Sequence, residues 1–263
     1  MKCLATSHFV SPQAAEQQVP SVYLHDLPCL DDSREDAFPP STQALQFPSG
    51  LLAWGGTLAP GRLLAAYRRG IFPWYSEGEP VLWWTPSPRC VLYPRDVYIS
   101  SRTQRRLRRG EFRVSADSAF ADVIQACAAA RPERPSTWIT SDMQSAYLAL
   151  HDLGVAHSIE AWRDGELVGG VYGLSIGHMF FGESMFSLIT DASKVALISL
   201  CRQLEEWGFG PVDCQVANPH LESLGAVEIG REEFEAALRD FTLRPRPDGS
   251  WRDTFGAGRN ETR

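Results

Sequence analysis

The pattern of hydrophobic and polar positions divides the chain into segments of different character. Residues 1–35 are polar, include Pro and Gln and show no periodicity, which predicts a flexible extension. Residues 36–92 are predicted to form a small α+β domain. Its expected elements are a buried strand at residues 51–56, a helix that begins at Pro60 and stops at Gly70, and two aromatic segments at residues 71–75 and 81–84.

Residues 93–245 mix helical and strand patterns, which predicts a second domain, followed by a tail at residues 246–263. Three helices are expected to begin at the N-caps Ser118, Thr140 or Ser141, and Asp191, and a last helix is expected at residues 231–241. Strands are expected at residues 157–162, 167–172, 179–182 and 212–216. The Asp164-Gly165 pair between the first two strands indicates a hairpin. The expected fold class is α+β, with two domains.

Composition limits the kind of protein this can be. Hydrophobic residues make up 44% of the 263 positions and charged residues 22%, values that are typical of a globular protein. No apolar run approaches the roughly 20 residues of a membrane-spanning helix. The six cysteines are scattered without a CxxC spacing, which argues against a zinc site and a disulfide framework. We expect a cytoplasmic protein with reduced thiols, no metal and no membrane partner.

The charge distribution contains one local exception to an acidic average. The formal net charge is −7, which disfavours indiscriminate binding to nucleic acids. One segment nevertheless gathers five arginines without an acid between them, namely Arg102, Arg105, Arg106, Arg108 and Arg109. Such a patch suits a polyanion that docks at a defined place, and the alternative is a solvated helix face.

Three polar residues are candidates for chemistry. Asp213 and Gln215 are two positions apart in a predicted strand, so their side chains are expected on one face and that of Cys214 on the other. A carboxylate beside an amide can orient an amine and a carbonyl, although both residues could equally hydrogen-bond neighbouring loops. Glu183 follows Gly182 at the expected end of an aromatic strand, a common position for a functional carboxylate. Its alternative role is that of a cap or an ion-pair partner.

Other patterns point to fewer functions. The chain has no Walker A or dinucleotide-binding glycine motif, and no G-x-S-x-G context surrounds Ser158, Ser184, Ser187 or Ser193. His157 and His178 lack partners at metal-ligand spacing, so structural roles are expected for them. Trp74 and Trp138 lie beside turn signals, where an aromatic ring can stack on a base or line a pocket.

Several stretches, taken in order, are similar to one protein family. They are Gly50-Leu51-Leu52-Ala53, Ala66 to Trp74, Trp83-Trp84-Thr85-Pro86, Thr137-Trp138-Ile139-Thr140, Ala156 to Glu160, Gly182 to Ser187, Ala192-Ser193-Lys194 and Asp213-Cys214-Gln215. This ordered set resembles the leucyl/phenylalanyl-tRNA–protein transferases. The resemblance extends from about Phe38 to Phe241 and so covers most of the chain.

The resemblance implies a fold, an activity and a set of substrates. The fold would be a small amino-terminal domain joined to a GNAT-like acyltransferase domain. The enzyme would move Leu or Phe, with Met as a further candidate, from charged tRNA to the N-terminal Arg or Lys of acceptor proteins and so mark them for degradation through the N-degron pathway. It would need no cofactor, and it would act as a monomer.

The resemblance also assigns roles to residues. Asp213, Gln215 and Glu183 match the catalytic set. The residues matching the aminoacyl- and adenosine-binding positions are Trp74, Trp138, Phe180, Gly182, Met185 and Ser187. The arginine run at 102–109 coincides with the tRNA-binding segment.

Some positions depart from the family pattern. Thr57 and Ala59 replace the usual Asp and Ser before the first helix, Leu188 stands where Arg is common, and Leu200 stands where Phe can occur.

Two other functions compete with this one. An acyl-CoA-dependent N-acetyltransferase would need a glycine-rich pyrophosphate loop before its long helix, and residues 187–194 contain no glycine. A non-catalytic RNA-binding module would account for the arginines and aromatics but would leave Asp213, Gln215 and Glu183 unexplained.

Overall fold

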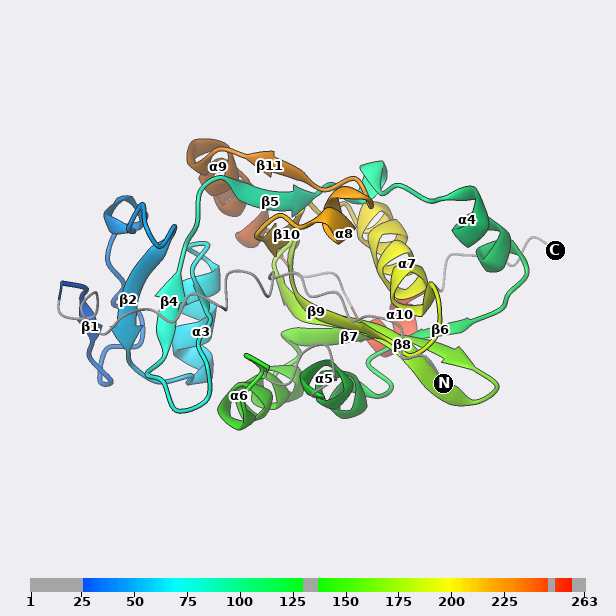
Figure 1. Cartoon of the computed structure of the whole chain (residues 1–263), viewed down its shortest axis with the longest axis horizontal. Coiled ribbons are helices and arrows are strands. Elements are labelled where there is room, and N and C mark those ends of the chain that lie inside the picture. Colours follow the sequence, from blue (N-terminus) through cyan, green and yellow to red (C-terminus); the bar gives the residue numbers. More distant parts are fainter. Residues whose placement is uncertain (1–25, 130–136, 246–248, 257–263) are drawn as a thin grey trace.

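The computed structural model describes residues 26–129, 137–245 and 249–256, which form two β-sheets and the helices around them (Figure 1). The smaller sheet has the order β1-β2-β4-β3, and the larger has the order β11-β5-β10-β9-β8-β7-β6. The smaller sheet contains β1 (Cys29–Leu30), β2 (Leu51–Gly55), β3 (Phe72–Pro73) and β4 (Leu82–Trp84). The larger contains β5 (Arg89–Leu92), β6 (Arg113–Ala116), β7 (Ala156–Arg163), β8 (Glu166–Ile176), β9 (Met179–Ser187), β10 (Val212–Gln215) and β11 (Val227–Ile229).

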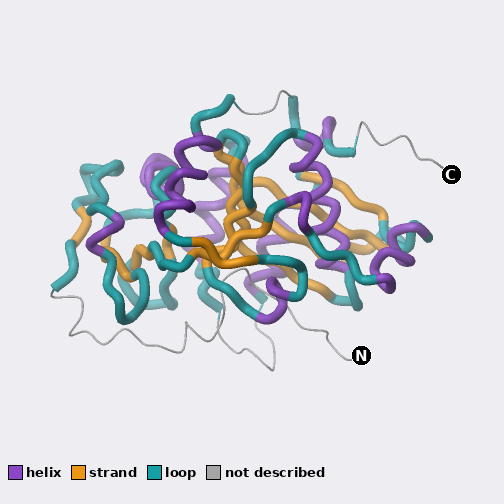
Figure 2. Tube along the Cα trace, turned by 90° about the horizontal axis from the view of Figure 1, so that it is seen from above, coloured by secondary structure: helices purple, strands orange, loops and turns teal. Residues whose placement is uncertain are grey.

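Helices connect and cover these strands (Figure 2). They are α3 (Pro60–Tyr67), α4 (Ser101–Arg108), α5 (Phe120–Ala128), α6 (Ser141–Asp152), α7 (Ala192–Glu206), α8 (Pro219–Glu222), α9 (Arg231–Thr242) and α10 (Trp251–Thr254), with 3-10 turns η1 (Ser41–Gln43) and η2 (Pro94–Asp96). The mixture of helices and sheets confirms the α+β class. Among the described residues, no helix is both long enough and apolar enough to cross a bilayer.

Local sequence signals account for several elements. Pro60 occupies the first turn of α3, and Gly70 follows the helix with a φ of 70°, a left-handed conformation that glycine adopts without steric cost. The β7–β8 hairpin turns at Asp164 and Gly165, whose φ angles of 53° and 84° suit the primed turns of hairpins. The predicted helix stop and hairpin are therefore confirmed. The segment predicted as a flexible extension contains β1, while its first 25 residues lie outside the described part of the chain.

Of the predicted N-caps, Thr140 is confirmed together with its capping bond, because its side chain accepts a hydrogen bond from the backbone N–H of Met143. The prediction for Ser118 is wrong: its backbone N–H and that of Ala119 donate to a carboxylate oxygen of Glu160, which reaches this helix end from β7. Asp191 is the N-cap residue of α7, as predicted, but it adopts a φ of 69° and its side chain makes no capping bond. In both places residues outside the helix concerned make the contacts with its first backbone N–H groups.

Two hydrophobic clusters lie on opposite faces of the larger sheet. One contains the buried residues of the smaller sheet and α3 together with those of α5 and α6, so the first part of the chain packs directly onto this face. The other lies between the opposite face and α7. In Figure 1, α5 and α6 lie below β7, β8 and β9, while α7 lies above them. The candidate site is formed where α3, α6 and the middle of this sheet meet.

Strand β10 runs parallel to β9, and only two residue pairs join them, Val212 with Phe180 and Asp213 with Phe181. Beyond these pairs, the side-chain amide of Gln215 on β10 donates to the backbone carbonyl of Gly182 on β9.

The GNAT-like description and the predicted boundary at residue 92 remain predictions. In the structure, Arg89–Leu92 already belongs to the larger sheet.

Candidate active site

Asp213 and Gln215 lie on β10 at an irregularity of the strand. Asp213 pairs with Val91 and Gln215 pairs with Cys90, so Cys214 is an extra residue without a partner on β5. Such a bulge breaks the alternation of side chains and re-aims the residues around it. Gln215 also has a φ of 58°, in the left-handed region. Simple strand spacing therefore does not describe how these two side chains come together.

Asp213 is held by a buried arginine that the sequence analysis did not single out. Nε and Nη2 of Arg89 donate to the two carboxylate oxygens of Asp213 at 2.8 and 2.7 Å. Both side chains are at most 1% exposed. The guanidinium also lies over the rings of Phe72 and Phe234, at 4.9 and 4.6 Å from their centroids. Arg89 adjoins Ser87-Pro88 at the start of a short strand, a context that carries no recognisable signal for such a role.

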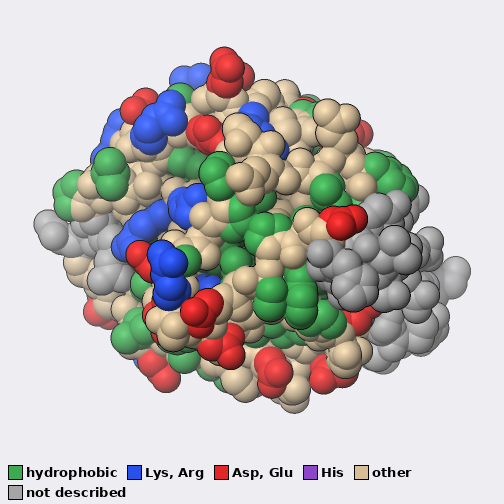
Figure 3. All heavy atoms as spheres, turned by 90° about the vertical axis from the view of Figure 1, so that its left-hand side faces the viewer, with side chains coloured by type: hydrophobic (Ala, Val, Ile, Leu, Met, Phe, Trp, Pro, Cys, Tyr) green, Lys and Arg blue, Asp and Glu red, His purple; other side chains and the backbone are tan. Residues whose placement is uncertain are grey.

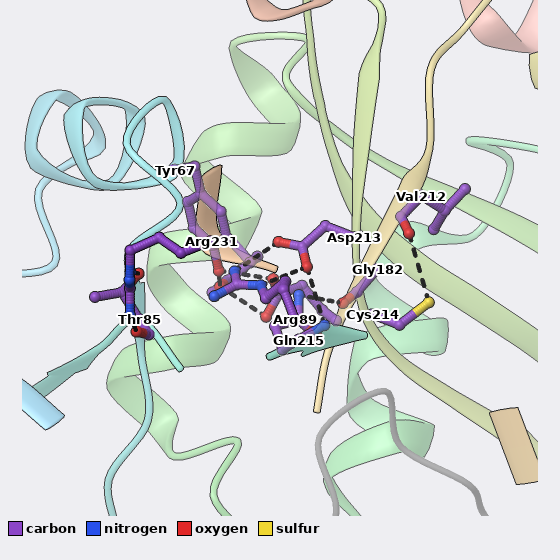
Figure 4. Close-up of polar contacts among 11 residues, drawn as sticks. Tyr67, Thr85, Arg89, Gly182, Val212, Asp213, Cys214, Gln215 and Arg231 are labelled. Carbon is purple, nitrogen blue, oxygen red and sulfur yellow. Dashed lines mark hydrogen bonds and ion pairs between the residues drawn. The ribbon is translucent and has the colours of Figure 1, made fainter. Parts of the chain in front are cut away.

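Gln215 is fixed at two of its polar groups, while a third has no partner (Figure 4). Its backbone N–H donates to Oδ1 of Asp213 at 3.0 Å, and its Nε2 donates to the carbonyl of Gly182 at 2.8 Å. Because a carbonyl only accepts, the amide nitrogen must face Gly182, which turns Oε1 away from it. Within the described part of the chain, this buried Oε1 has no hydrogen-bond partner.

Glu183 lies in the middle of β9, whereas its expected position was a strand end. Gly182 pairs with Gly173 and Ser184 pairs with Tyr172, so Glu183 is the extra residue of a second bulge. Its carboxyl is buried and contacts the hydroxyls of Tyr67 at 2.6 Å and Tyr147 at 2.9 Å. Burial is the main cause that raises the pKa of Glu183 to about 8. The catalytic role expected for Glu183 remains a prediction.

The two tryptophans expected to hold adenosine occupy different places. Trp74 lines a cavity of about 290 Å³. The cavity is otherwise lined by Phe47, Pro48, Ser49, Phe72, Trp84, Pro86, Ser87, Pro88, Val216 and Glu228. Val216 directly follows Gln215, so this aromatic cavity adjoins the polar site. Trp138 is buried beside the start of α6 and does not line this cavity.

Figure 3 views the end of the molecule formed by the smaller sheet, where hydrophobic side chains show near the middle of the face and basic ones gather to one side.

Phe180 and Met185 are buried between the larger sheet and α7. Ser187 is engaged locally, because its hydroxyl donates to the carbonyl of Ile189 at 2.8 Å and accepts from the backbone N–H of Ser193 at 3.2 Å. Ser187 therefore caps the first turn of α7 in place of Asp191. The ligand contacts expected for these residues remain predictions.

The arginine run forms α4 and is partly neutralised. Asp191 lies 3.3 Å from Arg106 and 3.5 Å from Arg102, and Glu111 lies 3.8 Å from Arg109. Arg106 also donates to the carbonyl of Thr190, which joins α4 to the start of α7. Arg105 and Arg108 are exposed, and for neither does the described part of the chain show an ion pair. These two arginines are the ones most available to a polyanion.

A larger cavity, of about 730 Å³, lies elsewhere and is lined by Asp117, His157 and Trp251 among others. None of the candidate site residues lines it, so cavity size does not locate the site. His157 bonds to Asp117 at 2.8 Å and stacks on Trp251, in line with the structural role expected for it. Over the described ranges, no three His, Cys, Asp or Glu side chains are placed to hold a metal ion.

Comparison with known proteins gives consistent matches over most of the chain. Residues 91–239 match the family described as "Leucyl/phenylalanyl-tRNA protein transferase", and residues 56–87 match its N-terminal domain. A Stutzerimonas stutzeri protein named leucyl/phenylalanyl-tRNA–protein transferase is 55% identical over 81% of this chain and 94% of its own length. Proteins of the same name from Nitrosomonas europaea and an Azoarcus species are 52% and 54% identical, over 85% and 88% of this chain and 95% and 97% of their own lengths.

Proposed function

The chain belongs to the leucyl/phenylalanyl-tRNA–protein transferase family, and on that premise we propose that it moves Leu or Phe from charged tRNA to the N-terminal Arg or Lys of acceptor proteins. The α-amine of the acceptor attacks the carbonyl carbon of the aminoacyl ester. A C–N bond forms, the C–O bond to the tRNA ribose breaks, and a proton from the amine ends on the ribose oxygen. The aminoacylated acceptor is thereby marked for degradation.

This reaction depends mainly on alignment. The ester is already activated, and an α-amine with a pKa of roughly 7.7–8.0 is partly neutral near physiological pH. Holding the two reactants in the right geometry can lower a barrier by up to about 7–11 kcal/mol. An enzyme for this step therefore needs a rigid hydrogen-bonding group beside the ester more than it needs a strong base.

The single observation that carries this assignment is the free Oε1 of Gln215. The same side chain is fixed through Nε2 on Gly182, and its backbone is fixed on Asp213. A held amide with one unused acceptor suits the N–H of an incoming amine. Both oxygens of Asp213 accept from Arg89, and one also accepts from the backbone N–H of Gln215, so we assign Asp213 the role of orienting Gln215 and not that of the base.

The remaining substrate contacts are assigned by position. The aromatic cavity at Trp74 suits the terminal adenosine of the tRNA, and the exposed Arg105 and Arg108 suit its phosphates. Phe180 and Met185 would line the aminoacyl pocket, with Met as a further aminoacyl group. Since charged tRNA is a cytoplasmic substrate, we place the reaction in the cytoplasm and assign it to a monomer.

The test is a transfer assay with radiolabelled Leu-tRNA and peptides that begin with Arg, Lys or Ala. Label should move to the Arg and Lys peptides and not to the Ala peptide. Binding of Leu-tRNA without transfer to any peptide would instead identify an RNA-binding module. Transfer of acetyl groups from acetyl-CoA to the same peptides would identify an N-acetyltransferase.

A further inference from the structure

Three buried polar groups close a ring beside the candidate site. The hydroxyl of Tyr67 on α3 contacts Oε1 of Glu183 at 2.6 Å, and the hydroxyl of Tyr147 on α6 contacts Oε2 at 2.9 Å. The two hydroxyls are also hydrogen-bonded to each other. Both tyrosines are fully buried and Glu183 is 3% exposed, so these contacts are shielded from bulk solvent.

The number of protons in this ring decides the charge of Glu183. Each of the three contacts needs one hydrogen, and two tyrosine hydroxyls supply two. If the carboxyl were ionised, both hydroxyl protons would point at it, and the two tyrosine oxygens would face each other without a hydrogen. If the carboxyl is protonated, its O–H donates to one tyrosine, that tyrosine to the other, and the second tyrosine back to the carboxyl.

We propose that Glu183 is a neutral carboxylic acid in the folded protein and that Tyr67 and Tyr147 are positioning residues that hold it in this form. The surroundings act in both directions, and burial prevails. Burial raises the pKa of Glu183 most strongly, hydrogen bonds from Tyr67 and Tyr147 to the ionised form lower it, nearby Asp213 raises it, and Arg89 lowers it. The hydroxyl of Tyr172 on β8 also lies buried in this region, without a hydrogen-bond partner in the described part of the chain.

A second buried carboxyl, Glu160, shows the contrast. It accepts from the hydroxyls of Ser115 and Ser158, each at 2.5 Å, and from the backbone N–H groups of Ser118 and Ala119. Every one of these contacts has its own donor hydrogen, so no proton on Glu160 is needed. Replacement of Glu by Gln is therefore expected to destabilise the protein at position 160 and not at position 183.

The ring bears on the reaction through Gly182, and this step rests on the proposed function. Gly182 precedes Glu183, and its carbonyl accepts from the Gln215 amide. The ring fixes β9 at this point against α3 and α6 and so sets where that carbonyl lies. Loss of the Glu183 proton would disturb the ring and, through Gly182, the placement of Gln215.

The sign of the pH effect follows from the raised pKa. Because the folded protein binds the Glu183 proton more tightly than the unfolded chain does, this contribution to stability is complete below the unfolded pKa, near 4.5. It declines as the pH rises and is lost once the pH passes the folded value of about 8.

The first test is structural and does not depend on transfer activity. In wild-type protein labelled with carbon-13 at glutamate carboxyls, one resonance should have the chemical shift of a protonated carboxyl at neutral pH. Its shift should change near pH 8, and the resonance should be absent from Glu183→Gln. In urea unfolding at pH 7, Glu183→Gln should not lower the midpoint relative to the wild type, because an amide can donate and accept in the ring and does not ionise in the unfolded chain. Glu160→Gln should lower the midpoint clearly. An ionised Glu183 at neutral pH, or equal losses in the two variants, would overturn the proposal.

The second test addresses positioning. Single-turnover transfer rates of wild type and Glu183→Gln are compared from pH 6 to pH 9 at saturating substrate. The ionisation of the amine affects both rates equally and cancels in their ratio. The transfer rate of the variant should therefore rise relative to that of the wild type as the pH passes about 8. A ratio that is constant with pH would refute the positioning role even if the carboxyl proves protonated. Absence of transfer by the wild type would refute the proposed function and leave the first test intact.

Discussion

The guanidinium of Arg89 donates two hydrogen bonds to the carboxylate of Asp213, one to each oxygen, although the two residues lie 124 positions apart in the chain. Two-point contact fixes the plane of the carboxylate as well as its position. Asp213 in turn accepts the backbone N–H of Gln215. The placement of Gln215 therefore depends on a residue that belongs to a different strand.

Removing the charge of Arg89 should destabilise the protein strongly. Arg89→Met would leave the Asp213 carboxylate buried without its partner, a change that typically costs about 3–5 kcal/mol. Urea unfolding measures the loss. Arg95→Met is the matched control, since Arg95 is 72% exposed and pairs with Asp96 at 3.5 Å; its effect should stay within about 0.5 kcal/mol. Similar effects of the two substitutions would contradict a structural role for the Arg89–Asp213 pair.

Altering the amide of Gln215 should reduce transfer with little effect on tRNA binding. In Gln215→Glu, a carboxylate faces the Gly182 carbonyl and cannot donate to it, so the side chain loses its orientation. Misplacement of a reacting group can cost about 10²-fold in rate. Single-turnover transfer of leucine to an Arg-initiated peptide provides the measurement.

Gln125→Ala is a suitable control for that experiment, because Gln125 is an exposed residue of α5. It should transfer at the wild-type rate. If Gln215→Glu also does, the amide has no part in aligning the substrates.

The salt dependence of tRNA binding should show whether the exposed arginines of α4 contact phosphates. Each phosphate contact that is lost should reduce the slope of log affinity against log salt by about 0.7–0.9. Arg105→Ala combined with Arg108→Ala should flatten the slope for tRNA binding by about two contacts. Arg163→Ala, which changes an arginine that is 51% exposed on the β7–β8 hairpin, should leave the slope unchanged. Equal slopes for all three proteins would identify the α4 arginines as a solvated face.

Removing the hydroxyl of Ser187 should weaken the start of α7. Because this hydroxyl accepts the backbone N–H of Ser193, Ser187→Ala should cost about 0.5–2 kcal/mol in unfolding free energy. The control is Ser145→Ala on α6, where the exposed hydroxyl bonds to the carbonyl of Ser141, and its effect should be within about 0.5 kcal/mol. Unchanged stability in Ser187→Ala, together with weaker aminoacyl-tRNA binding, would point to a ligand contact instead of a cap.

Local chemistry in the sequence was sufficient for elements whose signals come from neighbouring residues. Pro60 and Gly70 delimit α3, Thr140 caps α6, and Asp164-Gly165 turns the β7–β8 hairpin. Each of these features is decided by backbone preferences over a few positions, so it can be recognised without knowing the fold. Asp213, Gln215 and Glu183 could likewise be selected by residue type and by the family resemblance.

Only the tertiary structure decided how those three residues are used. Bulges at Cys214 and Glu183 shift the strand registers, and bulges depend on how neighbouring strands pair. The partners of the site come from distant segments: Arg89 for Asp213, and Tyr67 and Tyr147 for Glu183. The sequence determined which chemical groups are available. Burial and long-range contacts determined which of them carry charge, because those properties depend on what surrounds a side chain and not on the residues beside it in the chain.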